Sequence, residues 1–360
     1  MSETTLAAFA KNTNAKTNED TLEKAPQKTT PDPRALMREL KVYSQAKGFR
    51  SLWELASTLI PFVALSGAML WAISAGYWLA LLLTPVSGLL LLRLFIIQHD
   101  CGHGAFLSSK RGNDWIGRGL GVLTFTPYDC WKLSHARHHA RTGNLDKRGF
   151  GDVDTLTVKE YRAGTPLQRF GYRLYRHPIV LFGIGPAYLF FIRHRLPVGL
   201  MREGSIHWIS SMGTNAALAG IFTALGLTFG WGATFAVIML SVLIAASTGV
   251  WLFYIQHQYE DAHWDWQKDW SFHEAALMGS SYLSLPQPLR WFSGNIGIHH
   301  VHHLASAIPF YRLPEVMKAH PELEHLNRFS MSQTIRPMVL ALWDEERRKL
   351  VTFREARKTA

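Results

Sequence analysis

Cysteine is scarce in this sequence. The 360 residues include two cysteines, Cys101 and Cys130, and these do not form a CxxC pair. A disulfide scaffold and a cysteine-ligated metal cluster are therefore excluded, and we expect both thiols to be reduced and to face the cytosol. The N-terminal stretch also lacks the apolar core of a signal peptide, so we expect no cleaved leader.

Several common catalytic motifs are absent as well. The sequence contains no GxGxxG, GxxxxGK(S/T), GxSxG or HExxH pattern. Dinucleotide-binding proteins, P-loop enzymes, α/β-hydrolases and zincin proteases are therefore excluded, because each class needs one of these patterns. The His-Pro pairs at His177 and His320 both lack the glycines that follow this pair in cytochrome b5-like haem modules, so we expect no fused electron carrier.

Charge is almost missing from four long apolar runs, although the mean hydropathy of the whole chain is near zero, at -0.01. Glu54 and Arg93 are the charged residues within these runs, which cover 52–74, 77–97, 206–227 and 233–255. A helix of about 20 residues crosses the ~30 Å hydrocarbon core of a bilayer. The predicted fold class is therefore all-α, an integral membrane bundle of about four transmembrane helices. A fifth apolar run at 178–192 is too short to span, so we expect it to be interfacial or re-entrant.

The distribution of cations predicts how the chain is oriented. Arg93 is the one of 38 Lys and Arg that lies within a run, and the short turns at 75–76 and 230–232 contain none. The positive-inside rule then puts both termini and the long polar segments in the cytoplasm. We interpret the net charge of +11 as this bias plus attraction to anionic headgroups, and expect no nucleic-acid partner.

Three units follow from this division of the chain. Residues 1–50 form a polar N-terminal tail that we expect to be largely disordered, with a short amphipathic helix around 36–46. Residues 51–330 form the membrane domain. Residues 331–360 are predicted to be a charged C-terminal helix or tail.

Histidines are clustered at three places outside the apolar runs. The segment WKLSHARHHA at 131–140 places His135, His138 and His139 on one face of a helix. His299, His302 and His303 repeat the same spacing in HHVHH, and HDCGH at 99–103 supplies two more. Nine of the 17 histidines fall in the fifteen positions 99–103, 135–139 and 299–303. This arrangement is typical of metal ligands.

The number of histidines predicts two metals. Imidazole binds zinc, copper, iron and nickel, so the ligand type alone leaves the metal open. A structural zinc takes four ligands and a catalytic zinc about three, so eight or nine histidines are enough for a pair of ions. Two nitrogen-ligated metals beside lipid point to an oxygen-activating di-iron centre. Such a centre can remove hydrogen from an unactivated methylene, which no amino-acid side chain can do.

The three clusters resemble the histidine boxes of the membrane fatty acid desaturases, HxxxH, HxxHH and HxxHH, in the same order. The flanking segments WLFYIQHQYED at 251–261 and NIGIHHVHHLASAIPFYRLPE at 295–315 resemble bacterial and plastid acyl-lipid desaturases of the delta-12 (omega-6) class. The resemblance covers roughly residues 50–330. Front-end desaturases usually begin the third box with glutamine, and His299 at this position argues against that branch.

The resemblance implies a set of metal ligands. The eight box histidines are His99, His103, His135, His138, His139, His299, His302 and His303. In the superfamily a further histidine follows the last span, and His257 holds that position here. His257 also ends the fourth apolar run on the predicted cytoplasmic side, where an interfacial histidine bound to a headgroup is the alternative. The roles of His263, His273 and His300 remain open.

Residues around the boxes have expected supporting roles. Asp100, Asn295 and Asp261 are candidates for orienting imidazole N–H groups, and His300 is more suited to this role than to ligation. We expect the isolated histidines to be solvated, namely His177, His194, His207, His320 and His325. We expect five tryptophans to form an interfacial belt, with lining of an acyl channel as the alternative for one or two of them, namely Trp131, Trp251, Trp264, Trp266 and Trp270.

The resemblance implies an O2-dependent desaturase with two iron ions in the bacterial cytoplasmic membrane, its histidines facing the cytoplasm. A separate donor such as ferredoxin or cytochrome b5 would supply electrons, and the product would be a cis double bond in a membrane-lipid acyl chain, converting oleoyl to linoleoyl. The alternative is a di-iron hydroxylase or ketolase acting on an alkane, sterol or carotenoid. A non-catalytic metal-binding, transport or haem protein is a remote alternative, because haem needs at most two axial histidines. The acyl carrier (glycerolipid, CoA or carrier protein) and the oligomeric state stay open.

Overall fold

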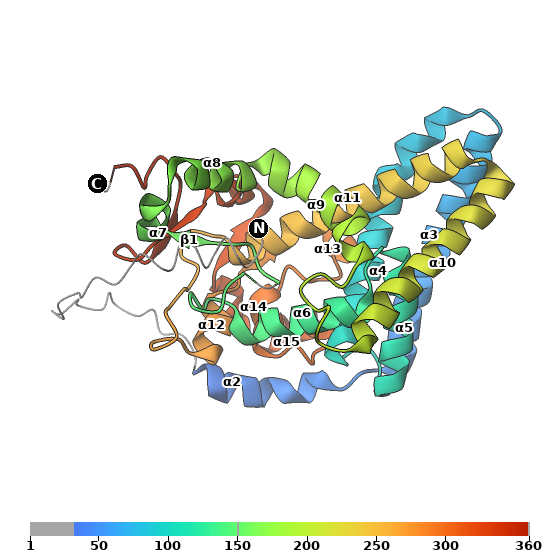
Figure 1. Cartoon of the computed structure of the whole chain (residues 1–360). Coiled ribbons are helices and arrows are strands. Elements are labelled where there is room, and N and C mark those ends of the chain that lie inside the picture. Colours follow the sequence, from blue (N-terminus) through green and yellow to red (C-terminus); the bar gives the residue numbers. More distant parts are fainter. Residues whose placement is uncertain (1–31, 150, 359–360) are drawn as a thin grey trace.

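Four long helices dominate the computed structural model, which describes residues 32–149 and 151–358. They are α3 (Gly48–Ser74), α4 (Thr84–His103), α10 (Ser205–Phe229) and α11 (Trp231–His257). A 3-10 turn, η2 (Trp78–Leu83), leads into α4 and lengthens that span. All four are long and apolar enough to cross a membrane, and they extend together away from the rest of the molecule (Figure 1). The predicted number and positions of the spans are confirmed.

Exposed apolar side chains on these helices fit a lipid environment. Trp71, Leu227 and Phe235 are all more than half exposed on the outside of the bundle. Leaving such large apolar surfaces in water is unfavourable, whereas lipid tails solvate them. Helix α4 is the most enclosed of the four, since α3, α5 and α11 all pack against it.

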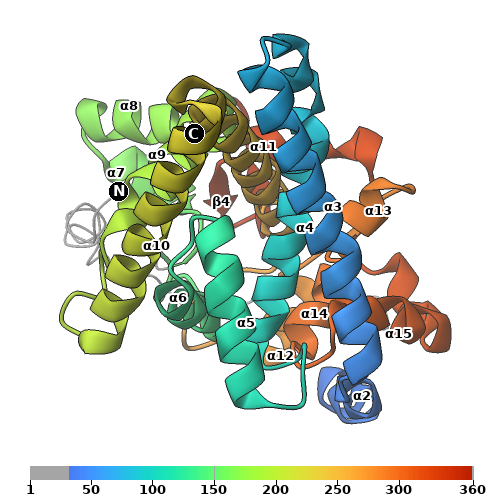
Figure 2. The ribbon, with the colours of Figure 1, turned by 90° about the vertical axis from the view of Figure 1, so that its right-hand side faces the viewer.

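Short helices form a cap at one end of the bundle, where α4 and α11 end and α3 and α10 begin (Figure 2). The helices that contribute to the cap are α2 (Pro33–Leu40), α5 (Lys110–Leu123), α6 (Tyr128–Arg141), α12 (Phe272–Met278), α13 (Leu289–Phe292), α14 (His299–Leu304) and α15 (Leu313–Ala319). The amphipathic helix predicted at 36–46 begins earlier, at Pro33, and continues as the 3-10 turn η1 (Lys41–Ser44). Residues 1–31 of the predicted tail lie outside the described residues.

The apolar run at 178–192 does not cross the bundle. It forms the π-helical turn η3 (Val180–Ile184) and the seven-residue helix α9 (Gly185–Phe191). The preceding segment contains α7 (Val158–Ala163) and α8 (Pro166–Tyr175). Ile179, Ile184 and Ile192 are each more than 60% exposed. This short, exposed apolar segment agrees with the prediction of an element that does not span.

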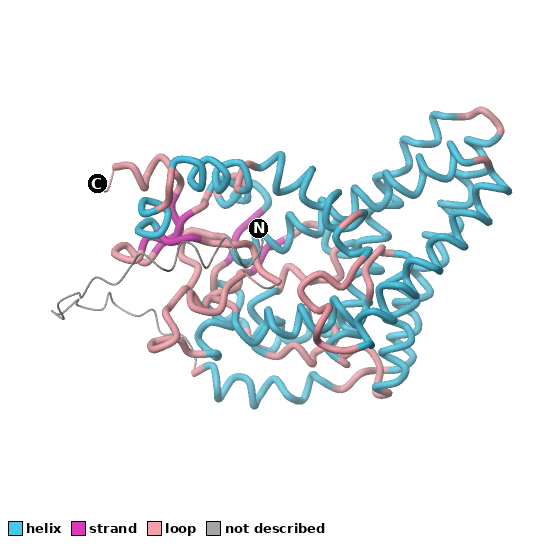
Figure 3. Tube along the Cα trace, viewed as in Figure 1, coloured by secondary structure: helices cyan, strands magenta, loops and turns pink. Residues whose placement is uncertain are grey.

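Strands are few and short (Figure 3). β1 (Leu156–Thr157) pairs in parallel with β4 (Leu342–Asp344), which pairs antiparallel with β5 (Lys349–Val351). β2 (Tyr282–Ser284) pairs in parallel with β3 (Arg328–Ser330). The remaining short turns are η4 (Arg193–Arg195), η5 (Phe310–Arg312), η6 (Pro321–His325), η7 (Met331–Thr334) and η8 (Pro337–Val339).

The helix or tail predicted for 331–360 is wrong. This segment contributes β4 and β5, and it packs against β1 and α7. Its apolar side chains Leu342, Trp343, Leu350 and Val351 are buried. Many charged residues surround these two short apolar pairs. β5 pairs with the nearby β4, and β4 pairs with β1, which is far away in sequence.

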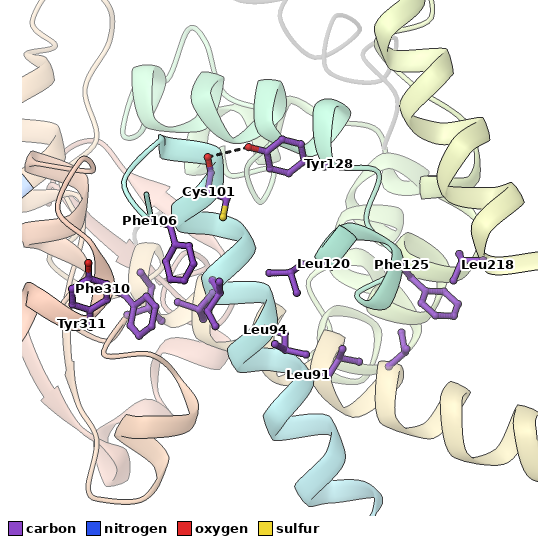
Figure 4. Packing of buried hydrophobic residues seen from close by; sticks show 14 residues of the cluster. Leu91, Leu94, Cys101, Phe106, Leu120, Phe125, Tyr128, Leu218, Phe310 and Tyr311 are labelled. Atoms are coloured by element: carbon purple, nitrogen blue, oxygen red, sulfur yellow. Dashed lines mark hydrogen bonds between the residues drawn. The ribbon is translucent and has the colours of Figure 1, made fainter. Parts of the chain in front are cut away.

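A buried cluster fixes α5 and α6 against the end of α4 (Figure 4). The Tyr128 hydroxyl reaches the Cys101 carbonyl at 2.9 Å and the Asp114 carboxylate at 3.0 Å. Gly117 makes this packing possible, because a Cβ there would lie 2.2 Å from the Tyr128 ring. Tyr128 begins α6, so this contact determines where the second histidine cluster meets the first.

Candidate metal centre

All nine predicted site histidines come together in two groups at the capped end of the bundle. The first histidine group contains His99, His103, His135, His139 and His302, and the second contains His138, His257, His299 and His303. Within each group one nitrogen from every ring lies within 4.8 Å of all the others. Four helices supply them, since α4, α6, α11 and α14 all end or pass here.

The rings point their Nε2 atoms inward. In the first group, the Nε2 of His135 lies 3.0 Å from that of His103 and 3.1 Å from that of His139. In the second group, the Nε2 of His138 lies 3.2 Å from that of His257 and 3.3 Å from that of His303. One imidazole N–H proton can form a hydrogen bond between two ring nitrogens, but it cannot form hydrogen bonds among three ring nitrogens that meet at one point.

These spacings fit a bound cation. A metal–imidazole bond of about 2.1 Å gives neighbouring nitrogens a separation of roughly 3.0 Å in octahedral geometry and roughly 3.4 Å in tetrahedral geometry. The separations of 3.0 to 3.3 Å lie within this range. Nine inward lone pairs without thiolates are a donor set for zinc, copper, iron or nickel. The residues present therefore fit two metal ions.

Burial keeps the rings neutral. The pKa of His135, His139, His299, His302 and His303 lies well below the ordinary value of 6.5, because burial disfavours the charged imidazolium. Neighbouring rings lower these pKa values further. A neutral imidazole keeps the lone pair that a metal requires, so this environment favours ligation over protonation.

Three of the nine rings have an acceptor at Nδ1 among the described residues. The Nδ1 of His99 lies 3.3 Å from Asp100, that of His257 lies 3.2 Å from the Gly279 carbonyl, and that of His138 contacts the Asp152 carboxylate. The predicted contact with Asp100 is thus present. The contact with Asp152 was not predicted from the sequence. This carboxylate lies in the glycine-containing loop after α6, and its distance in sequence from the ligands follows no helical spacing.

Asn295 and Asp261 do not support the rings as predicted. Asn295 accepts from Arg290 at 3.1 Å and donates to the Phe310 carbonyl. The Asp261 side chain is 74% exposed and faces Lys349 at 3.5 Å. Asn295 is close to the third box in sequence and Asp261 is close to His257, but both side chains have other partners.

The other histidines lie outside both groups. His300 is buried, but its Nε2 lies 3.1 Å from the Leu323 carbonyl, and His263 pairs with Asp265 at 2.8 Å. His273 packs against the Phe272 ring.

Two of the histidines expected to be solvated are enclosed instead. His207 is 5% exposed on α10. Burial lowers the pKa of His194 to about 3. The His194 ring packs edge-on against the Phe190 ring, with centroids 5.0 Å apart.

Trp131 is part of the site, not of an interfacial belt. Its ring stacks on His135 with centroids 4.6 Å apart and lies 5.8 Å from His99. Gly102 makes room for it, because a Cβ there would come within 2.8 Å of the ring. Trp264 is also buried, at 5% exposure. The Trp131 ring therefore covers one side of the first histidine group.

The two groups differ in their surroundings. All four rings of the second group are buried, whereas His103, His135 and His139 of the first are partly exposed. A small cavity adjoins the second group, and its lining includes Phe253, Val153 and His257. The Phe253 ring lies 4.9 Å from that of His138 and 5.1 Å from that of His257. The cavity thus brings an apolar surface to the buried second histidine group.

Comparison with known proteins identifies related sequences. A sequence model described as "Fatty acid desaturase" matches residues 75–334. A fatty acid desaturase of Bacillus subtilis is 39% identical over 320 residues, which cover 89% of this chain and 90% of the relative. An sn-1 acyl-lipid omega-3 desaturase (ferredoxin) of Synechocystis is 31% identical, covering 68% of each chain. An sn-1 oleoyl-lipid 12-desaturase of the same organism is 27% identical, covering 67% of this chain and 70% of the relative.

Proposed function

The chain belongs to the fatty acid desaturase family, and from this premise we propose that it is a di-iron acyl-lipid desaturase that converts oleoyl to linoleoyl chains in a membrane. The observation that carries the proposal is the convergence of nine histidine rings, each with one nitrogen directed inward, into a group of five and a group of four. Both groups lie at the end of helices long and apolar enough to cross a bilayer, where an acyl chain is available.

Iron is the metal we propose for both groups. Bound iron would supply the O2-dependent removal of two hydrogens from neighbouring methylenes, a reaction that needs redox chemistry and that zinc cannot perform. The balance is one O2, two electrons from a donor, two protons and the two substrate hydrogens, giving a cis double bond and two waters. In this scheme the histidines hold the metals, and burial of the second group keeps bulk water from the reacting carbons.

The position of the new double bond is the finer part of the proposal. Its support is the likeness of the box flanks to the delta-12 class and the relative named as an oleoyl-lipid 12-desaturase. The relative named as an omega-3 desaturase makes linoleoyl to linolenoyl conversion the second candidate. Neighbouring methylenes differ little in reactivity, so in either case the protein selects the bond by positioning the chain.

We further propose a ferredoxin-type electron donor and a cytoplasmic orientation of the histidines. The name of the omega-3 relative supports the donor. The cation-free turns beside Gly76 and Gly232 support the orientation, because long cationic segments stay inside.

Expression in a bacterial host that makes oleoyl lipids but no dienes tests the proposal. We expect linoleoyl chains by mass spectrometry of fatty acid methyl esters and close to two irons per purified chain. New monoenes made from saturated chains, or hydroxylated lipids, would refute the assigned position or reaction. A full complement of zinc in freshly purified active enzyme would refute the di-iron assignment.

A further inference from the structure

Asp152 is the carboxylate that contacts the second histidine group. It follows His138 by 14 residues, in the loop after α6, and its Oδ1 accepts from the Nδ1 of His138. The His138 side chain is fully buried and that of Asp152 is 10% exposed. Because the Nε2 of His138 points at His257 and His303, Asp152 lies on the side of the ring opposite the metal position.

The loop is built to bring Asp152 this close. Gly151 has a φ of +81°, which favours glycine. A Cβ at Gly151 would lie 2.8 Å from the Ser134 carbonyl oxygen and 3.4 Å from the His138 Cβ. Only a residue without a side chain therefore lets the backbone approach α6 at this point.

Hydrogen bonds from Arg176 fix the C-terminal end of the loop. Arg176 donates to the Asp154 carbonyl at 3.0 Å and to the Tyr254 hydroxyl at 2.9 Å. Tyr254 lies on α11, one turn before His257. The loop thus joins α6 to α11, the two helices that supply His138 and His257 to the second group.

We propose that Asp152 is a positioning residue for the second metal, an inference that rests on the proposed di-iron function. By accepting the Nδ1 proton of His138, the carboxylate fixes the tautomer in which Nε2 carries the lone pair, and it aims that lone pair at the metal position. The first group has its own carboxylate in Asp100, which also accepts from the Phe310 amide at 2.6 Å. Among the site histidines, Asp152 therefore contacts a ligand of the second group and Asp100 a ligand of the first.

Metal content tests this role without relying on activity. Full-length protein in detergent is loaded with Fe(II) and then incubated with increasing concentrations of a chelator. The iron retained per chain at each concentration is measured by elemental mass spectrometry. Wild type is expected to retain two irons per chain. Asp152→Ala is expected to lose one iron at roughly 10- to 100-fold lower chelator concentration, the usual effect of removing such a partner. Asp152→Asn keeps a neutral acceptor and should fall between the two, because charge-assisted hydrogen bonds are about twice as strong.

Asp265→Ala is the matched control, since Asp265 pairs with His263, a histidine outside both groups. It should retain both irons to the same chelator concentration as wild type. Gly151→Ala tests the loop independently and should resemble Asp152→Ala. Equal retention of two irons by wild type, Asp152→Ala and Asp152→Asn would overturn the positioning role while leaving the proposed function intact. Failure of wild type to bind two irons would overturn both.

Discussion

An intramembrane ion pair below the site offers a quantitative test of the packing. Arg93 on α4 and Glu54 on α3 are 2% and 3% exposed and contact each other directly. The guanidinium also donates to Thr58 at 3.1 Å and lies 4.1 Å from the centre of the Trp291 ring. Since Arg93 precedes His99 on α4 and Trp291 is on α13, this pair joins the spans to the cap.

Replacing Glu54 with glutamine removes the charge that balances Arg93 but keeps the size. Breaking a buried pair by removing one partner typically costs about 3–5 kcal/mol, because the other charge stays buried without compensation. A loss of 3 kcal/mol shifts the unfolding equilibrium roughly 150-fold. The change is measured by denaturant unfolding in one detergent, followed by tryptophan fluorescence.

Arg50 provides the control for this measurement. It contacts Glu54 at 2.6 Å, but its side chain is 55% exposed. Arg50→Gln should therefore cost less than about 1 kcal/mol. The double variant Glu54→Leu with Arg93→Met should be more stable than either single variant, because it leaves no unpaired charge. If Glu54→Gln is no less stable than Arg50→Gln, our account of this pair is wrong.

Three further outcomes are expected. His303→Ala should abolish desaturation, because its Nε2 belongs to the second group, whereas His325→Ala, at an exposed position, should keep wild-type activity in the methyl ester assay. A reporter fused after Gly232 should be periplasmic and one after Arg148 cytoplasmic; a periplasmic Arg148 would contradict the orientation. Phe253→Ala should change the ratio of positional isomers in the product with iron content unchanged, because its ring touches two ligands beside the cavity, and an unaltered ratio would remove Phe253 from substrate positioning.

The spans were predictable because composition alone decides them. A run of about 20 apolar residues has few stable environments other than a bilayer, and its neighbours change this little. The convergence of histidines from one cluster was also predictable in part, because a helix places residues three and four apart on one face. His135 and His139 do share the first group.

The division into two groups could not be predicted from the boxes. His138 lies beside His139 in sequence, yet it belongs to the second group together with His257. A step of one residue turns the side chain by about 100° around the helix, so adjacent ligands point at different places. Which group each ring joins depends on α11 and α14, and the position of these helices is set by tertiary packing.

Contacts between distant residues account for the remaining differences. Asp152 reaches His138 through a loop that Gly151 and Arg176 hold, and Trp131 reaches His135 because Gly102 leaves room. β1 finds its partner β4 almost 190 residues later. None of these contacts has a local pattern in the sequence.

The interleaving of ligands also links the two metal positions to each other. α6 gives His138 to one group and His139 to the other, and α14 divides His302 and His303 in the same way. The rings of His139 and His303 stack across the boundary, with centroids 4.0 Å apart and planes 8° from parallel. A helix cannot move one ligand without moving its neighbour, so a shift of α6 or α14 disturbs both groups together. The spacing between the two histidine groups is therefore a property of two rigid helices, and under the proposed function it would keep the two bound metals at a fixed separation.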